Sequence, residues 1–73
     1  MKEDELDKYL GEFVKIKDFD NNIEFGNLYK IKDGICIRRG QEEYHPINNG
    51  YYLECINKGV CYRKSHIKKI EIV

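Results

Sequence analysis

The residues of this sequence that could do chemistry are three cysteines and two histidines: Cys36, His45, Cys55, Cys61 and His66. Structural zinc sites usually contain two cysteines separated by about two to four residues, and this chain has no such pair. A cysteine next to a histidine acts as a nucleophile only where its surroundings lower the thiol pKa and a third group orients the imidazole. The spacing supplies neither feature. We therefore predict that the chain is not an enzyme and holds no metal or other cofactor.

Cys55 and Cys61 flank the Asn-Lys-Gly sequence at residues 57–59, which is typical of a tight turn between two strands. In that register the two thiols lie directly opposite each other, with Cβ atoms about 4.5–5.5 Å apart, close to the disulfide range. Three interpretations stay open: small apolar side chains in a reduced core, a redox-active or disulfide pair, and a zinc site completed by His45 or His66. The odd number of cysteines favours the first interpretation.

Asp18, Asp20 and Asn22 are spaced like the beginning of a calcium-binding loop. Such a loop needs a glycine at its sixth position and a bidentate glutamate at its twelfth. Ile23 and Tyr29 occupy those positions here. The segment is therefore predicted to be a polar turn and not a calcium site.

Charge is unevenly distributed along the chain, although the formal net charge is zero. Residues 1–12 contain five acidic residues against two lysines, whereas residues 58–69 contain five basic residues and no acidic one. A basic pair of strands that also carries an aromatic ring can follow phosphates while the ring stacks on a base. The alternative is a solvated face whose lysines protect a sheet edge from aggregation. The nucleic-acid interpretation uses Lys58, Tyr62, Arg63, Lys64, Lys68 and Lys69.

Six of the residues are tyrosines, and two of them, Tyr51 and Tyr52, are adjacent. Because side chains alternate along a strand, these two cannot share one face, so at least one is expected to meet solvent or a partner. Tyrosine is common in strands and also enriched at binding hot spots. A candidate partner-binding surface therefore consists of Tyr51, Tyr52, Tyr62, Arg63, Lys64 and Lys68.

Two kinds of local pattern predict the elements that position these side chains. Residues 1–11 form a short amphipathic helical turn, with Leu6 and Leu10 on one face and Gly11 as its end. A helix this short is unstable alone, so we expect it to dock on the rest of the chain. Residues 12–73 form a single mostly-β domain in which apolar side chains recur at every second position.

The alternation predicts five or six short antiparallel strands, at residues 13–17, 28–32, 35–38, 51–56, 60–63 and 67–73. Asp33-Gly34 is the strongest hairpin signal in the chain. Residues 18–25, 40–43 and 45–50 are predicted to be connections, and Pro46 argues against a central strand in the last of them. The candidate core consists of Val14, Ile16, Leu28, Ile31, Ile35, Ile37, Leu53, Ile56, Val60, Ile67, Ile70 and Ile72.

The order of these elements over residues 12–73 resembles an SH3-like barrel. The resemblance rests on the first strand and its polar excursion, on a second strand entered at Gly26, and on Gly59 to Ile67 as a strand that runs into one 3₁₀ turn before the last strand. Signalling SH3 domains bind proline-rich peptides on a shelf of Trp and Tyr. This chain has no Trp, and its excursion has no Tyr, so that activity is not expected.

More narrowly, the chain resembles short proteins encoded by phages and mobile elements of low-GC bacteria, which often bind a host component. Together with the small size, the absence of catalytic motifs and the tyrosine- and lysine-rich surface, it favours a non-enzymatic protein-interaction module that binds and inhibits a host protein or defence factor. A nucleic-acid-binding barrel is the alternative, and a homodimer formed through the tyrosines is a further possibility for the same surface. No segment approaches the ~20 apolar residues of a membrane span, and the acidic N-terminus lacks a signal-peptide pattern, so a cytoplasmic location without a membrane partner is predicted.

Overall fold

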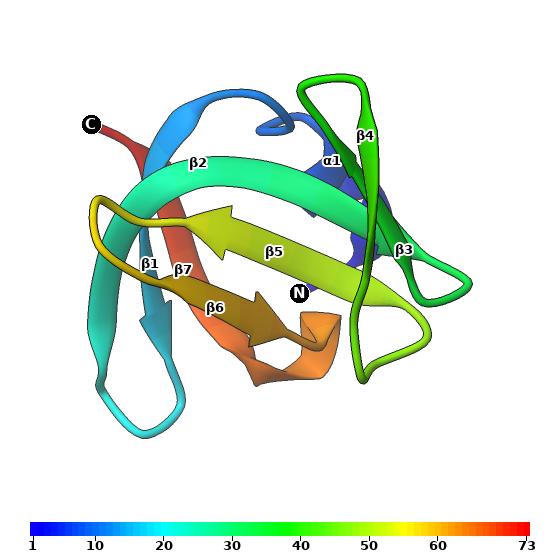
Figure 1. Ribbon diagram of the computed structural model, residues 1–73. Helices are drawn as coiled ribbons and strands as arrows, with labels where there is room; N and C mark the ends of the chain where they lie inside the picture. The colour runs from blue at the N-terminus through cyan, green and yellow to red at the C-terminus, as the bar shows by residue number, and fades with distance from the viewer.

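The computed structural model describes residues 1–73 as one short helix, seven strands and one 3₁₀ turn (Figure 1). No helix of the structure has the length and apolar character that crossing a membrane requires. In chain order the elements are α1 (Glu3–Asp7), β1 (Phe13–Asp18), β2 (Ile23–Lys32), β3 (Ile35–Arg38), β4 (Gln41–Tyr44), β5 (Gly50–Glu54), β6 (Gly59–Tyr62), the 3₁₀ turn η1 (Lys64–His66) and β7 (Ile67–Ile72).

Strand β2 is the centre of a single antiparallel sheet. Residues 23–27 of β2 pair with β1, and residues 27–31 pair with β5 on the opposite edge of β2. The end of β2 also pairs with β3, while β1 continues to β7, β3 to β4 and β5 to β6. Figure 1 shows β2 as a long arch over the other strands, with β5 and β6 in front of β1 and β7 in this view. The curvature of one strand thus wraps the sheet around a common core.

Two tight hairpins connect β2 to β3 and β3 to β4. Asp33 and Gly34 both have positive φ angles, 53° and 78°, as a type I′ turn requires, so the predicted hairpin is confirmed. Arg39 and Gly40 have similar angles of 54° and 75° and form a second hairpin that the sequence did not predict. The expectation of a loop at residues 40–43 is therefore wrong, and the strands number seven instead of five or six. Strand β4 is polar and largely exposed, so it lacks the apolar alternation that reveals a half-buried strand.

The connection between β1 and β2 is shorter than the predicted excursion at residues 18–25, because β2 already begins at Ile23. Asp18 ends β1 and closes the turn, since its Oδ1 accepts hydrogen bonds from the backbone N–H groups of Asp20 and Asn22, both at 2.9 Å. Strand β6, the turn η1 and strand β7 follow one another in the order on which the SH3 resemblance was based. The mostly-β class with a short N-terminal helix is confirmed, while the likeness to SH3 domains stays a prediction.

The core combines one residue of the helix with the inner faces of six strands. Seven residues of the predicted core are buried: Val14, Ile16, Leu28, Ile31, Leu53, Ile67 and Ile70. The same core also contains four residues that the prediction omitted, namely Leu6, Cys36, Tyr51 and Tyr62.

Five residues were wrongly assigned to the core. In β3 the alternation has the opposite phase, so Cys36 faces inward, Ile37 is 65% exposed and Ile35 is half-buried. Ile56 lies beyond the end of β5, in the turn, and is fully exposed. The other two are Ile72, which is exposed at the end of β7, and Val60, which is half-buried against the core.

Helix α1 docks on the sheet, as predicted, through a completely buried Leu6. Leu10 lies after the end of the helix and is partly exposed, so the predicted pair of docking residues is reduced to one. The ammonium of Lys30, on β2, lies 2.8 Å from Glu3 and 2.7 Å from Asp7. These ion pairs attach the acidic helix to β2, and the Met1 ammonium that precedes the helix donates to the carbonyl of Lys64 at 3.0 Å.

Candidate functional site

Two of the tyrosines predicted to contact a partner are part of the core. Tyr51 and Tyr62 are only 1% and 4% exposed, because both occupy inward positions of the β5–β6 pair, where they lie opposite each other. The Tyr51 hydroxyl donates to Asp7 at 2.6 Å. Burial raises the pKa of Tyr51, and this hydrogen bond raises it further. Burial also raises the pKa of Tyr62. Neither ring presents a surface to a protein or to a nucleic-acid base, so their assignment to a binding surface is corrected.

Tyr52 faces the other side of β5 and is half-buried by neighbours on three elements. Its ring centroid lies 4.8 Å from that of His45 and 5.0 Å from the guanidinium carbon of Arg38. The ring also covers Gly59, where a Cβ atom would be 2.0 Å from the Tyr52 hydroxyl oxygen. Only a glycine leaves room for the ring at that position, so Tyr52 packs within the sheet more than it offers a contact surface.

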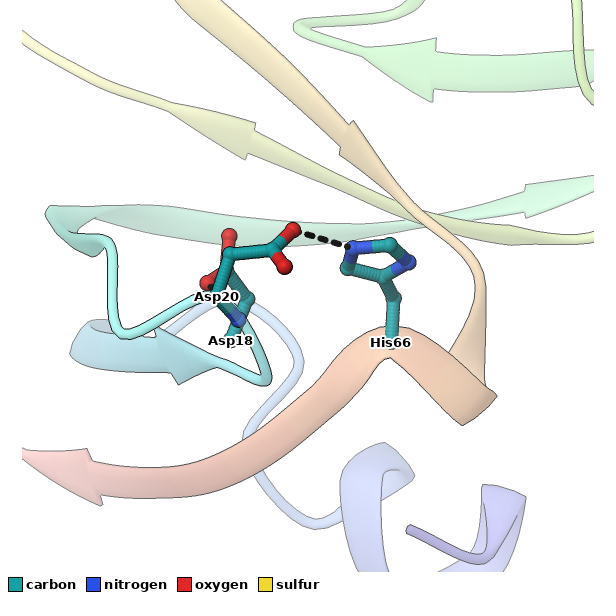
Figure 2. A group of neighbouring side chains, drawn as sticks. All are labelled: Asp18, Asp20 and His66. Carbon is teal, nitrogen blue, oxygen red and sulfur yellow. Dashed lines mark hydrogen bonds and ion pairs between the residues drawn. The ribbon is translucent and has the colours of Figure 1, made fainter.

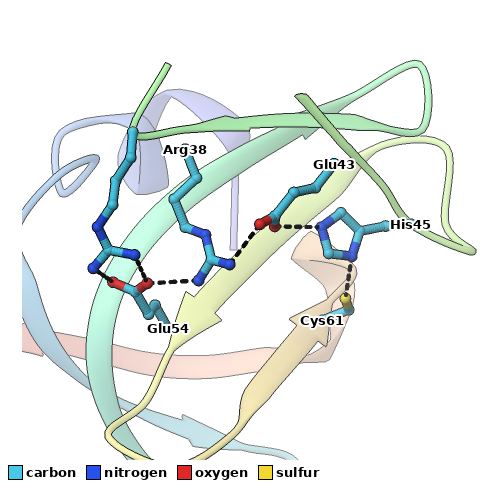
Figure 3. A network of polar contacts seen from close by, with 6 residues as sticks. Arg38, Glu43, His45, Glu54 and Cys61 are labelled. Atoms are coloured by element: carbon cyan, nitrogen blue, oxygen red, sulfur yellow. Dashed lines mark hydrogen bonds and ion pairs between the residues drawn. The ribbon is translucent and has the colours of Figure 1, made fainter. Parts of the chain in front are cut away.

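Arg38 and His45, which contact this ring, belong to a series of polar contacts that ends at a thiol. Figure 3 shows the series without the ring. Arg38 bridges Glu43 and Glu54, and Arg39 adds a second cation at 2.7 Å from Glu54. His45 lies between Glu43, at 3.6 Å from its Nε2, and the sulfur of Cys61, at 3.5 Å from its Nδ1.

Glu43, His45 and Cys61 follow one another in the order of a nucleophilic triad: carboxylate, imidazole, thiol. The thiol, however, is not activated. Burial raises the pKa of Cys61, so the neutral thiol predominates near pH 7, and a neutral thiol is a poor nucleophile. The Nε2 atom of His45 is buried without a hydrogen-bond partner, since Glu43 is too distant. The contacts instead attach the β3–β4 hairpin to β5 and β6.

The predicted opposition of Cys55 and Cys61 is wrong. The observed register places Cys61 opposite Tyr52 and Gly59 opposite Glu54, so the turn is formed by residues 55–58 instead of 57–59. Cys55 is part of that turn, where its N–H donates to the carbonyl of Lys58 at 2.9 Å. All three cysteines are free thiols in the structure.

Asp18, Asp20 and His66 form the one group of metal-ligand side chains that come within 4.8 Å of one another (Figure 2). Nε2 of His66 lies 3.5 Å from Asp20, across the space between the β1–β2 turn and η1. The carboxylate of Asp18, however, already accepts three hydrogen bonds inside its own turn, two from backbone N–H groups and one from the Asn22 side chain. Burial alone would raise the pKa of Asp18, but these bonds outweigh it and lower the pKa. The carboxylate of Asp18 is therefore used to close the β1–β2 turn.

The predicted basic surface is divided between two ends of the β5–β6 pair. Lys58 lies in the turn at one end and pairs with Glu24 at 2.7 Å. Arg63 and Lys64 follow β6 at the other end, where they line a groove together with Lys30 and Lys32 of β2. The two remaining predicted lysines, Lys68 and Lys69, are exposed on β7. The structure thus assembles only part of the predicted set, and its aromatic member is buried.

An apolar groove lies at the Lys58 end, and the sequence did not predict it. Phe13 of β1 and Phe25 of β2 are 48% and 46% exposed, and Ile56 of the β5–β6 turn is 102% exposed. These three side chains line a depression of about 600 Å³. Its polar rim includes Glu24, Asn27, Arg39, Glu54, Asn57 and Lys58.

Alternation with the buried Val14 was the available signal that Phe13 points outward. Phe25 was assigned to a loop and Ile56 to the core, so no signal in the sequence brought the three together.

No known protein family, curated protein or solved structure matches this chain.

Proposed function

We propose that this chain is a non-enzymatic protein-binding domain whose contact surface is the apolar groove of Phe13, Phe25 and Ile56. The observation that carries the proposal is the complete exposure of Ile56 beside two half-exposed phenylalanines. Burying apolar surface contributes about 25 cal/mol per Å², so a partner that covers these side chains gains binding free energy from them. Large apolar side chains that are exposed together mark interaction sites more often than those that occur singly.

The rim of the groove suits a protein partner because its charges are already paired. Lys58 lies 2.7 Å from Glu24, and Arg39 lies 2.7 Å from Glu54. A partner therefore meets an apolar centre with a neutralised polar border, which is the usual anatomy of a protein–protein interface. A standard interface covers about 800 Å² on each partner. That area is about a sixth of the 4931 Å² surface of this chain, so the partner is expected to extend past the groove.

The wider role that we propose is that of a phage or mobile-element accessory protein, which acts in the cytoplasm by binding and inhibiting a host protein or defence factor. Its support is the composition and small size of the sequence, together with the exposed apolar side chains of the groove.

The test is a pull-down from a low-GC bacterial lysate with the wild type and two variants. Ile56→Glu places a charge at the centre of the groove, in a turn where the exposed side chain contributes little to stability. Ile37→Glu is the matched control, since Ile37 is 65% exposed on β3 and outside the groove. We expect a protein that the wild type and the control retain and that Ile56→Glu loses.

Equal recovery by all three proteins would contradict the assignment of the groove, and no recovery above background would contradict protein binding. Light scattering on the same samples identifies the remaining occupant. If the wild type forms a concentration-dependent dimer that Ile56→Glu abolishes, the partner at the groove is a second copy of the chain.

A further inference from the structure

A second groove, separate from the apolar one, lies where β5 begins and β6 ends. It has a volume of about 460 Å³. Glu3 is the only acidic residue along it. Its other polar lining residues are Lys30, Lys32, Asn49, Arg63, Lys64 and Ser65.

The cations of this groove are not all neutralised. Lys30 has two carboxylate partners, Glu3 and Asp7, at 2.8 and 2.7 Å. The other three cations, Lys32, Arg63 and Lys64, lie within ion-pair distance of no carboxylate. A concave surface with low-dielectric walls focuses the field of such charges and raises the local concentration of anions. The groove therefore keeps a positive excess in a chain whose net charge is zero.

Neutral hydrogen-bond donors accompany the cations. The side-chain oxygen of Asn49 accepts a bond from the N–H of Asp33 at 3.3 Å, which orients the amide and leaves its nitrogen to donate to a ligand. Ser65 adds a hydroxyl in the turn η1, directly after Lys64. A phosphate group accepts from all of these donor types, and arginine binds it with two parallel hydrogen bonds.

We propose that this groove binds a small molecule that carries two or more phosphate groups. Three unpaired cations match more negative charge than a single phosphate monoester supplies. The volume lies within the range of about 300–1,000 Å³ that is typical of small-ligand sites. The ligand neutralises Lys32, Arg63 and Lys64, while Lys30 stays paired with Glu3 and Asp7 beside it.

The experiment is a titration of the ¹⁵N-labelled chain with pyrophosphate at low ionic strength, followed by amide chemical shifts. We expect saturable shifts at residues 30–32, 49–50 and 63–65, and affinity that falls as salt is added. The double variant Arg63→Gln/Lys64→Gln is expected to weaken binding about tenfold or more, because it removes two charge-assisted contacts. Lys68→Gln/Lys69→Gln removes the same charge from exposed positions of β7 outside the groove, and it should change the affinity less than about threefold.

Equal weakening by both double variants would overturn the proposal, because it would show attraction to net charge without a site. A parallel titration with a short oligothymidylate separates a small ligand from a nucleic acid. Oligothymidylate shifts that extend to Lys68 and Lys69, without saturable pyrophosphate shifts, would also overturn the proposal and favour the nucleic-acid surface predicted from the sequence. Amide spectra of the variants that remain dispersed confirm that they are folded.

Discussion

The two grooves lie at opposite ends of the β5–β6 pair, and they differ in how their charges are compensated. At the turn end, Lys58 and Arg39 each have a carboxylate within 2.7 Å, and the exposed side chains without a partner are apolar. At the other end, Lys32, Arg63 and Lys64 have no carboxylate partner, and most of the lining residues are polar or charged. The first arrangement gains free energy by excluding water, the second by neutralising charge.

The comparison shows that net charge and total apolar content reveal little about where a small domain binds. The chain has equal numbers of acidic and basic residues, yet the pairing of those residues leaves one end neutral and the other positive. Helix α1 decides this distribution, because its acids pair with Lys30 of the sheet and not with Arg63 or Lys64. Four changes test the comparison, and the largest expected effect comes first.

The most disruptive change is the addition of a methyl group at Gly26 or Gly50. At each of these glycines the backbone passes close to a neighbouring strand. A Cβ at Gly26, near the apolar end, would lie 2.3 Å from the carbonyl oxygen of Glu54. A Cβ at Gly50, near the cationic end, would lie 2.3 Å from the carbonyl oxygen of Tyr62. Because backbone cannot move aside as a side chain can, Gly26→Ala and Gly50→Ala are each expected to lower the free energy of unfolding by about 2–4 kcal/mol. Urea unfolding measures this loss, and a value below about 1 kcal/mol would show that the backbone at these crossings relaxes to accept the methyl group.

The next change removes the compensating acid at the cationic end. Asp7→Asn weakens the pairing of Lys30 and the hydrogen bond from Tyr51, so we expect a loss of about 1 kcal/mol in unfolding free energy. Lys30 then keeps Glu3 as its one carboxylate partner, the local negative charge falls, and the affinity of the cationic groove for pyrophosphate should rise about two- to fivefold. Asp4→Asn is the matched control, since Asp4 belongs to the same helix and forms no ion pair. An equal rise with Asp4→Asn would mean that the general field of the helix matters and the pairing of Lys30 does not.

Acid is expected to weaken both the α1 anchor and the β1–β2 turn. Burial would raise the pKa of Asp7, but hydrogen bonds from Lys30 and Tyr51 outweigh it and lower the pKa. The pKa of Asp18 is also lowered, because the hydrogen bonds of its turn outweigh burial. A carboxyl with a lowered pKa binds protons less readily in the folded than in the unfolded state, so its stabilisation is complete above about pH 4 and is lost as the pH falls through the folded value.

Urea midpoints between pH 7 and pH 2.5 should therefore stay level to about pH 4 and then decline. Asp18→Asn keeps an oxygen that can accept the two backbone hydrogen bonds but does not titrate, so its decline should be shallower than that of the wild type. An identical pH profile for the two proteins would exclude Asp18 as a contributor.

Local patterns predict the fold better than the sites. The alternation in β1 and β5 correctly assigned Val14, Ile16 and Leu53 to the core, because both strands have one fully buried face. It failed in β3, where isoleucines on both sides of Cys36 made the outward phase look like the core phase. It also missed β4, which is held in the sheet by the turn at Arg39 and Gly40 and not by burial of its own side chains.

The sites depend on contacts between segments far apart in the sequence. Phe13, Phe25 and Ile56 come from three different elements, and only the pairing of β1, β2 and β5 brings them together. The burial of Tyr51 and Tyr62 could not be read from composition, because tyrosine suits both a core and a surface. The position of the cationic groove could not be predicted without knowing that the acids of the helix pair with Lys30.

Cys55 provides the most delicate test of the comparison, because it lines the apolar groove and is remote from the cationic one. Burial, with a smaller contribution from Glu24, raises the pKa of Cys55, so alkylation should be slower than for a free thiol near pH 7 and should accelerate as the pH rises. Pyrophosphate is expected to leave this rate unchanged, whereas a protein partner bound at Ile56 should reduce it. Peptide mass spectrometry measures the alkylation of Cys55 separately from that of Cys36 and Cys61, whose pKa values burial also raises. If pyrophosphate alone slowed the alkylation of Cys55, the two ends of the β5–β6 pair would be coupled, and they could not be treated as independent sites.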